Sequence, residues 1–195
     1  MKFTKLPQNT FEELQLNAGI LLSSFTPSTA EITESEILGA TSGGISFNDT
    51  PTYQDFGDDI DNCPKNTKEL KRVESRDIKI SGTFLTVNTT RAKSLIATAD
   101  IGSSDNTKIT PRDEIKTADF ADIWWVGDYS DKNGATNGGY IAIHLIDALS
   151  TGGFSIQTGD KAKGQFAFEY TAHYSLNDVE KVPYEIYIKS GTAEM

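Results

Sequence analysis

Strict alternation of apolar and polar residues in the stretch QFAFEYTAHYSL, residues 165–176, is the strongest constraint that the sequence places on the fold. Successive side chains of a β-strand point to opposite faces of the sheet, so this stretch predicts a strand with one buried and one wet face. The predicted buried face carries Phe166, Phe168, Tyr170, Ala172 and Tyr174. The predicted polar face carries Gln165, Glu169, Thr171 and His173.

Two other stretches alternate in the same way. In DIKISGTF the apolar residues are Ile78, Ile80 and Phe84, and the polar face carries Asp77, Lys79, Ser81 and Thr83. In PYEIYIK one face carries Tyr184, Ile186 and Ile188, and the other carries Glu185 and Lys189. Further predicted strands, separated by glycine-rich breaks, are AGILLSSF, GGISF, IWWVGDY, GYIAIHLIDAL and GFSIQ. The whole pattern predicts a mainly β fold, in which two antiparallel sheets pack as a sandwich or barrel.

One segment, NTTRAKSLIATAD, has the period of a helix instead of a strand. Its apolar residues recur at the spacing i, i+3, i+4 and i+7: Ala92, Leu95, Ile96 and Ala99. Asn88, or one of the threonines after it, can cap the first turn. We therefore expect one α-helix near residues 89–100, flanking the sheets.

The length of 195 residues suits a single domain, residues 1–195. Two segments do not fit a compact sandwich. Residues 1–43 hold one short apolar run among polar residues and predict an N-terminal arm with a first short strand. Residues 48–72 predict a long loop, and structureless connections beyond roughly 12–15 residues are usually functional or disordered.

Composition excludes several classes of function. The formal net charge of −10 repels a phosphate backbone, so sequence-specific or tight DNA binding is not expected. A single cysteine, Cys63, rules out an internal disulfide and a structural zinc site built on cysteines. No run reaches the roughly 20 apolar residues of a membrane helix, and the N-terminus lacks the apolar segment of a secretory signal. We expect synthesis in the cytoplasm and no membrane partner.

The stretch GDYSDKNGATNGGY, residues 127–140, resembles an acidic cation-binding loop. Aligning Gly134 with the invariant glycine of a helix–loop–helix calcium site puts Tyr129 and Tyr140 at two ligand positions, where neither can serve. The flanking segments read as strands, and Asn, Asp and Gly favour tight turns. The favoured interpretation is a β-hairpin connection, and no metal ion or cofactor is expected.

Catalytic chemistry is poorly supported. His173 shares a predicted polar face with Glu169 and could form a general-base pair, but no nucleophile lies beside it. His144 lies within a predicted strand and is interpreted as a partly buried, hydrogen-bonded histidine. Trp124 and Trp125 are adjacent on a strand and point to opposite faces, so core packing is the default for at least one. The sequence predicts a protein that is not an enzyme.

A run of charge that changes sign lies within the predicted long loop. The acidic residues come first and the basic residues follow: Asp55, Asp58, Asp59, Asp61, Lys65, Lys68, Lys71 and Arg72. Such a run is usually a solvated face. A loop with an acidic and a basic end is also suited to connect copies of one protein head to tail, and heterologous contacts of that kind generate rings or filaments.

Several long blocks, read together, resemble a known family. The blocks are GATSGGISF, DFGDDIDNCPKNTKELKR, SGTFLTV, DIWWVGDYSDKNGATNGGYIAIHL, ALSTGGF and KGQFAFEYTAHYS. They are similar to the major tail proteins, which are the tail tube subunits of long non-contractile tailed bacteriophages and related prophages. The resemblance runs from about residue 39 to residue 187, and it covers the terminal segments least.

The resemblance implies the phage tail tube fold and a structural role. Hexameric rings of the subunit would stack into a hollow tube, through which genome DNA passes without specific binding. It implies that residues 48–72 and the N-terminal segment make contacts within and between rings. Because both predicted polar faces come from strict alternation with one wet side, we hypothesise that one or the other lines the lumen. The other partners would be the tape measure, terminator and distal tail proteins. The expected location is the virion tail, assembled in the host cytoplasm.

Three alternatives remain open at this point. The chain could be a calcium- or carbohydrate-binding β-sandwich that uses the loop at residues 128–137 with Trp124 or Trp125. It could be an acidic hydrolase that uses His173 with Glu169. Within the phage interpretation, the tube could lie inside a contractile sheath.

Overall fold

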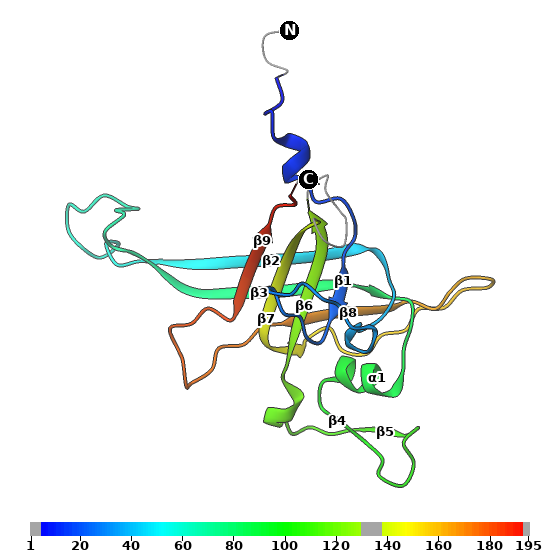
Figure 1. Cartoon of the computed structure of the whole chain (residues 1–195). Coiled ribbons are helices and arrows are strands. Elements are labelled where there is room, and N and C mark those ends of the chain that lie inside the picture. The colour runs from blue at the N-terminus through cyan, green and yellow to red at the C-terminus, as the bar shows by residue number, and fades with distance from the viewer. Residues whose placement is uncertain (1–4, 130–137, 193–195) are drawn as a thin grey trace.

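The computed structural model of the chain describes residues 5–129 and 138–192, and Figure 1 shows its course. The strands of this part are β1 (Ile20–Leu22), β2 (Thr41–Asp55), β3 (Lys71–Phe84), β4 (Ala99–Ile101), β5 (Ile109–Pro111), β6 (Ala121–Tyr129), β7 (Gly139–Ser150), β8 (Phe166–Thr171) and β9 (Tyr184–Lys189). The α-helix α1 spans Thr89–Ile96, and short 3-10 helices span Thr10–Glu13, Glu34–Glu36 and Thr117–Asp119. The chain is mainly β, as the sequence predicts.

The strands form one large antiparallel sheet that folds into two layers. The order along it is β1-β6-β7-β8-β3-β2, with β9 on β7 as a branch, and β4 pairs only with β5. The first part of β7 pairs with β6 and β9, whereas Leu149 and Ser150 pair with β8. Between these parts the pairing with β6 shifts register, and Asp147 takes a positive φ of 49°. We call the layer of β1, β6, β7 and β9 sheet A, and the layer of β2, β3, β8 and the end of β7 sheet B.

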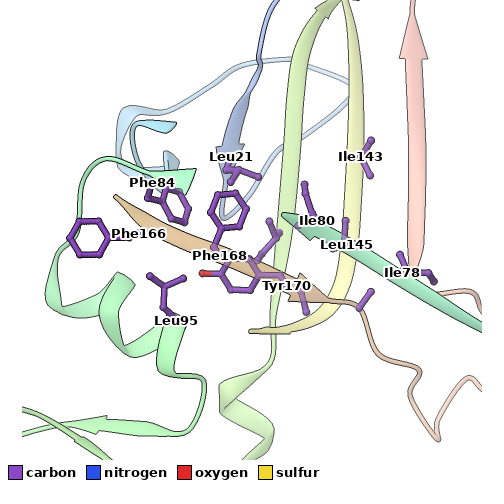
Figure 2. Close-up of a cluster of buried hydrophobic side chains, with 13 residues drawn as sticks. Leu21, Ile78, Ile80, Phe84, Leu95, Ile143, Leu145, Phe166, Phe168 and Tyr170 are labelled. Carbon is purple, nitrogen blue, oxygen red and sulfur yellow. The ribbon is translucent and has the colours of Figure 1, made fainter. Parts of the chain in front are cut away.

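Sheets A and B cross steeply (Figure 1) and enclose the main core between their facing sides. Figure 2 shows this core, to which β3 and β8 contribute the residues that the sequence predicts to be buried. They are Ile78, Ile80, Phe84, Phe166, Phe168, Tyr170 and Ala172. Leu21, Ile143 and Leu145 face them from sheet A. Burial of alternate apolar side chains on two facing sheets is what stabilises the sandwich.

The predicted apolar faces are wrong at their ends. Tyr174 lies beyond the end of β8 and is 45% exposed. On β9, Tyr184 packs against the core, but Ile186 and Ile188 are 47% and 60% exposed. The reason is that sheet B covers only one end of β9, because β2 is the last strand of that sheet.

A second, smaller core lies on the other face of sheet A. Phe25, from the segment that follows β1, packs against Trp124 and Tyr140 with ring centroids 5.7 and 5.4 Å apart. The Tyr140 hydroxyl donates to the carbonyl of Pro27 at 2.6 Å. Residues 20–38 are therefore part of the body. The predicted arm of residues 1–43 is too long, and within the described chain only its first part, with the helix Thr10–Glu13, projects from the fold (Figure 1).

The helix begins where the sequence predicts and ends sooner. The Asn88 side chain accepts a hydrogen bond from the backbone N–H of Arg91 at 2.8 Å, which caps the first turn. Leu95 is fully buried against the core. Ala97 takes a positive φ of 68° and stops the helix, and the next residues form β4. The predicted last turn, up to residue 100, is thus a strand that pairs with β5.

Candidate assembly surfaces

The two polar faces predicted on separate strands are one continuous surface. Antiparallel pairing places Ser81 opposite Glu169 and Lys79 opposite Thr171. On the other side of β3, pairing with β2 places Asn48 opposite Lys79. The outer face of sheet B is therefore lined by polar side chains from three strands: Ser46, Asn48, Thr50, Asp77, Lys79, Ser81, Thr83, Glu169 and Thr171. We call it the polar face. The β2 residues were missed, although ISFNDT alternates in the same way.

The one lysine of the polar face is paired with two carboxylates of the same face. The Lys79 ammonium lies 3.0 Å from an Asp77 carboxylate oxygen and 3.7 Å from a Glu169 carboxylate oxygen. The hydrogen bond to Asp77 is the main cause that raises the pKa of Lys79. Thr151 donates to Glu169 at 3.0 Å and shares a 2.7 Å hydrogen bond with Thr171. The result is a surface dominated by hydroxyl groups, on which the lysine is held by carboxylates of the same chain.

Two residues predicted for this face lie apart from it. Gln165 precedes β8 and exchanges backbone hydrogen bonds with Gln157 at 2.8 and 2.9 Å. His173 follows the end of β8, packs edge-on against Phe120, and its Nδ1 lies 3.2 Å from the carbonyl oxygen of Asp147. The alternative in which His173 pairs with Glu169 is not formed, because the chain turns toward the kink of β7 after Ala172 and the backbone N–H of His173 donates to the Ile146 carbonyl.

The predicted long loop of residues 48–72 is the outer end of a β-hairpin, in which a connecting loop joins two strands. β2 and β3 continue as a two-stranded ribbon to Asp55 and Lys71, which pair with each other, and only residues 56–70 connect them. Figure 1 shows this ribbon extending well past β9. We call residues 50–75 the hairpin arm. At its root Arg76 forms an ion pair with Asp49, and the Tyr184 hydroxyl donates to Asp49 at 2.9 Å.

At the tip of the arm, the two signs of charge lie together. Asp55 accepts backbone hydrogen bonds from Gly57 and Asn66 at 2.9 and 2.7 Å, and these bonds, led by that from Gly57, lower the pKa of its carboxyl. Lys71 donates to the Asn66 side chain at 3.2 Å, and Lys68 pairs with Glu69 at 3.5 Å. Arg72 donates to the carbonyls of Glu69 and Lys71.

The acidic and the basic parts of the sign-changing run therefore lie next to each other at the tip of the arm. They are not the two separated ends that the sequence predicts. The exposed carboxylates of Asp58, Asp59 and Asp61 form no ion pair within the described residues, and Lys65 is also exposed. Apolar side chains of the arm are exposed as well, with Tyr53 at 54%, Phe56 at 52% and Val73 at 47%.

His144 is part of a polar cluster on the other face of sheet A. Its Nε2 lies 3.0 Å from an Asp122 carboxylate oxygen, and its ring stacks on Trp124 with centroids 3.9 Å apart. Its Nδ1 is buried without a hydrogen-bond partner in the structure, 3.7 Å from Glu185. Glu185 also accepts from Tyr187 at 2.5 Å and from Lys181 at 3.1 Å, and these bonds, that from Tyr187 first, lower the pKa of its carboxyl. The contacts of His144 include no hydroxyl or thiol nucleophile.

The groups proposed for a calcium- or sugar-binding site are engaged elsewhere. Trp124 is only 7% exposed between Phe25, His144 and Tyr187. The Trp125 indole N–H donates to the Ala18 carbonyl at 3.0 Å. Asp128 accepts from the Asn17 side chain at 2.5 Å, and residues 130–137 of the predicted loop lie outside the described residues. Across residues 5–129 and 138–192 no group of three or more His, Cys, Asp and Glu is arranged to hold a metal ion.

The chain matches no protein-family model, and it has no significant match among curated proteins. None of the helices in the described ranges has both the length and the apolar character that crossing a bilayer requires.

Proposed function

We propose that this chain is the structural subunit of a bacteriophage tail tube, which assembles with itself into stacked hexameric rings around a hollow conduit for DNA. The resemblance of its sequence blocks to major tail proteins motivates the proposal. The observation that carries it is the surface of the isolated chain, which is far larger than that of a self-sufficient monomer.

The solvent-accessible surface of the chain is 13176 Å². A compact monomer of 21.3 kDa is expected to expose about 9,100 Å², from the scaling of surface with mass. The excess comes from parts that project from the body, namely the hairpin arm, the N-terminal segment and the long loops between β7, β8 and β9 (Figure 1). Ordering projecting segments costs conformational entropy, and contacts with other copies would offset that cost.

The projecting segments carry exposed apolar side chains, which favour association with other copies over exposure to water. Leu6 and Phe11 of the N-terminal segment are 73% and 64% exposed, and Leu176 of the loop before β9 is 95% exposed. Isolated exposed apolar residues are ordinary, but groups of them on every projection mark contact surfaces. The same projections carry the exposed charges of the arm tip, which can select partner and orientation.

The polar face is the part of the surface best suited to a lumen. It is broad, rich in hydroxyl groups, and its lysine is already paired with Asp77 and Glu169. Because DNA binding depends on free cations that neutralise phosphates, such a wall would let the duplex pass without holding it. The ends of the tube would then present the ring surfaces to tape measure, terminator and distal tail proteins.

Negative-stain microscopy and sedimentation velocity on the purified chain test the proposal. We expect rings or tubes of uniform diameter above a threshold concentration, and monomers below it. A single monomeric species up to millimolar concentration, at both low and physiological salt, would contradict it.

A further inference from the structure

One edge of sheet B is followed by a segment whose sequence predicts a strand but which is not a strand in the structure. The other edge is a strand with a free side, to which such a segment could be added. The segment is GFSIQ, residues 153–157, in which Phe154 and Ile156 alternate with Ser155 and Gln157. The sequence predicts a strand here. Among the described residues, the one ladder contact of this segment is an isolated bridge between Gln157 and Gln165.

This segment continues the β7 edge of sheet B. The backbone N–H groups of Thr151 and Gly152 still donate to the Glu169 carbonyl, and then the chain leaves β8. Phe154 lies with its ring 6.0 Å from that of Phe166, so it is on the core side of the sheet. Phe154 and Ile156 remain 43% and 55% exposed, because nothing in the described chain packs over them completely.

The opposite edge of sheet B is β2, a strand of 15 residues that, within residues 5–129 and 138–192, pairs on one side only, with β3. Its other side presents unpaired backbone N–H and C=O groups, which invite an added strand. Register shifts interrupt the edge between Ser42 and Ile45 and between Thr52 and Tyr53, and its one proline is Pro51, so the regular stretch open to an added strand is residues 45–50.

Next to this edge lies an uncovered apolar ledge of sheet A. β2 crosses β9 at its first residue, where the rings of Phe47 and Tyr184 are 5.4 Å apart. β7 continues past β2 (Figure 1), and on the adjoining β9 the residues Ile186 and Ile188 are 47% and 60% exposed. Pairing of Ile143 with Ile186 and of Ile141 with Ile188 places these side chains on one face, with Ile186 and Ile188 exposed.

We infer that residues 153–157 of one copy form a strand on the β2 edge of the next copy, with Phe154 and Ile156 packed on the ledge of Ile141, Ile186 and Ile188. The directions agree. β2, β3, β8 and the end of β7 alternate in direction, so the segment that follows β7 runs antiparallel to β2. Repeating this contact joins sheets B edge to edge and leaves the polar face continuous on one side. The inference rests on the proposed self-assembly and specifies its interface.

The first test uses substitutions that the monomer should tolerate. Phe154→Ser with Ile156→Ser should leave the folded monomer intact and raise the concentration needed for assembly by at least about tenfold, since two apolar contacts are lost. The matched control is Val87→Ser with Ile115→Ser, which removes two exposed apolar residues outside both edges and outside the projecting segments, and its assembly threshold should stay close to that of the parent. In the parent, the amides of residues 153–157 should become protected from hydrogen exchange on assembly.

The second test locates the contact directly. In a Cys63→Ser background, the chain carrying both Ile156→Cys and Ile188→Cys should give a ladder of covalent oligomers with a short bismaleimide reagent. A mixture of the two single variants should stop at dimers. If the parent forms tubes while the ladder, the protection and the assembly defect are all absent, this interface is wrong and the tube proposal stands. If the parent forms no oligomer, the tube proposal itself fails.

Discussion

At the scale of single residues, Arg112 fixes the part of the chain between α1 and β6. Its guanidinium forms an ion pair with Asp119, whose side chain is only 1% exposed, and another with Asp100 at 3.2 Å. It also donates to the carbonyl of Glu114. These contacts tie β4, β5 and the 3-10 helix Thr117–Asp119 together, where few apolar side chains are buried. The hydrogen bond from Arg112 is the main cause that lowers the pKa of the Asp119 carboxyl.

This pair predicts a specific dependence of stability on pH. Because the carboxyl pKa of Asp119 is lowered in the folded state, the pair stabilises the fold above the unfolded value, about 4, and its contribution is lost as the pH falls through the folded value. Arg112→Met should lower the melting temperature at pH 7 and reduce the further loss between pH 5 and about 2. Lys116→Met, which removes an exposed partner of Asp100, is the control. It should change the melting temperature at pH 7, and its further loss at acid pH, much less than Arg112→Met does. Equal acid sensitivity in Arg112→Met and the parent would contradict this assignment.

The cap of α1 gives a second prediction at this scale. Asn88→Ala removes the acceptor for the Arg91 backbone N–H and should cost about 1 kcal/mol of unfolding free energy in urea titrations. Thr90→Ala, at an exposed position of the same first turn, serves as the control and should cost less. Equal losses of unfolding free energy in the two variants would mean that the Asn88 cap does not stabilise the helix.

At the scale of elements, we expect the tip of the hairpin arm to be needed for assembly but not for folding of the subunit. Asp55 and Lys71 lie directly opposite each other, so residues 56–70 can be replaced by Asn-Gly, the usual two-residue hairpin turn. The shortened chain should keep its melting temperature within a few degrees, because the core residues are untouched. Tube formation should be lost or strongly reduced, as measured by microscopy and sedimentation. Tubes of normal length from this variant would show that residues 56–70, the tip of the arm, are not needed for the assembly contacts.

The elements also show what the sequence can and cannot predict. Alternation identifies β3 and β8 and nearly all their core residues, because both strands have one dry and one wet face. It fails for the outer part of β2, where three successive residues, TYQ, are exposed on both faces and so show no alternation. Pro51 argues against a strand there, yet it is tolerated on an edge where its missing N–H breaks no ladder bond. The polar face itself could not be predicted as one surface, since the register that joins β2, β3 and β8 is a long-range property.

At the scale of the whole molecule, the polar face predicts how assembled tubes treat DNA. Parent tubes assembled with labelled duplex DNA should retain almost none of it after pelleting. Replacing both partners of the lysine, with Asp77→Lys and Glu169→Lys, places three cations per copy on this face and should cause retention that disappears as salt is raised. Asp77→Asn with Glu169→Gln changes the same two positions without adding cations, and it should retain far less DNA than the reversed variant. Absence of retention in the reversed variant would show that DNA does not meet this face.

β7 belongs to both layers of the sandwich, and its course has a mechanical consequence. Asp147, at the kink, is held from both sides: its N–H donates to the Asp122 carboxylate at 3.1 Å, and its carbonyl lies 3.2 Å from Nδ1 of His173. Any rotation of sheet A against sheet B must therefore bend the backbone of β7 at Asp147, where these contacts hold it on both sides. We therefore expect sheets A and B to move together as one rigid unit. In a stack of such subunits, a displacement on one side of each subunit would be transmitted to its other side.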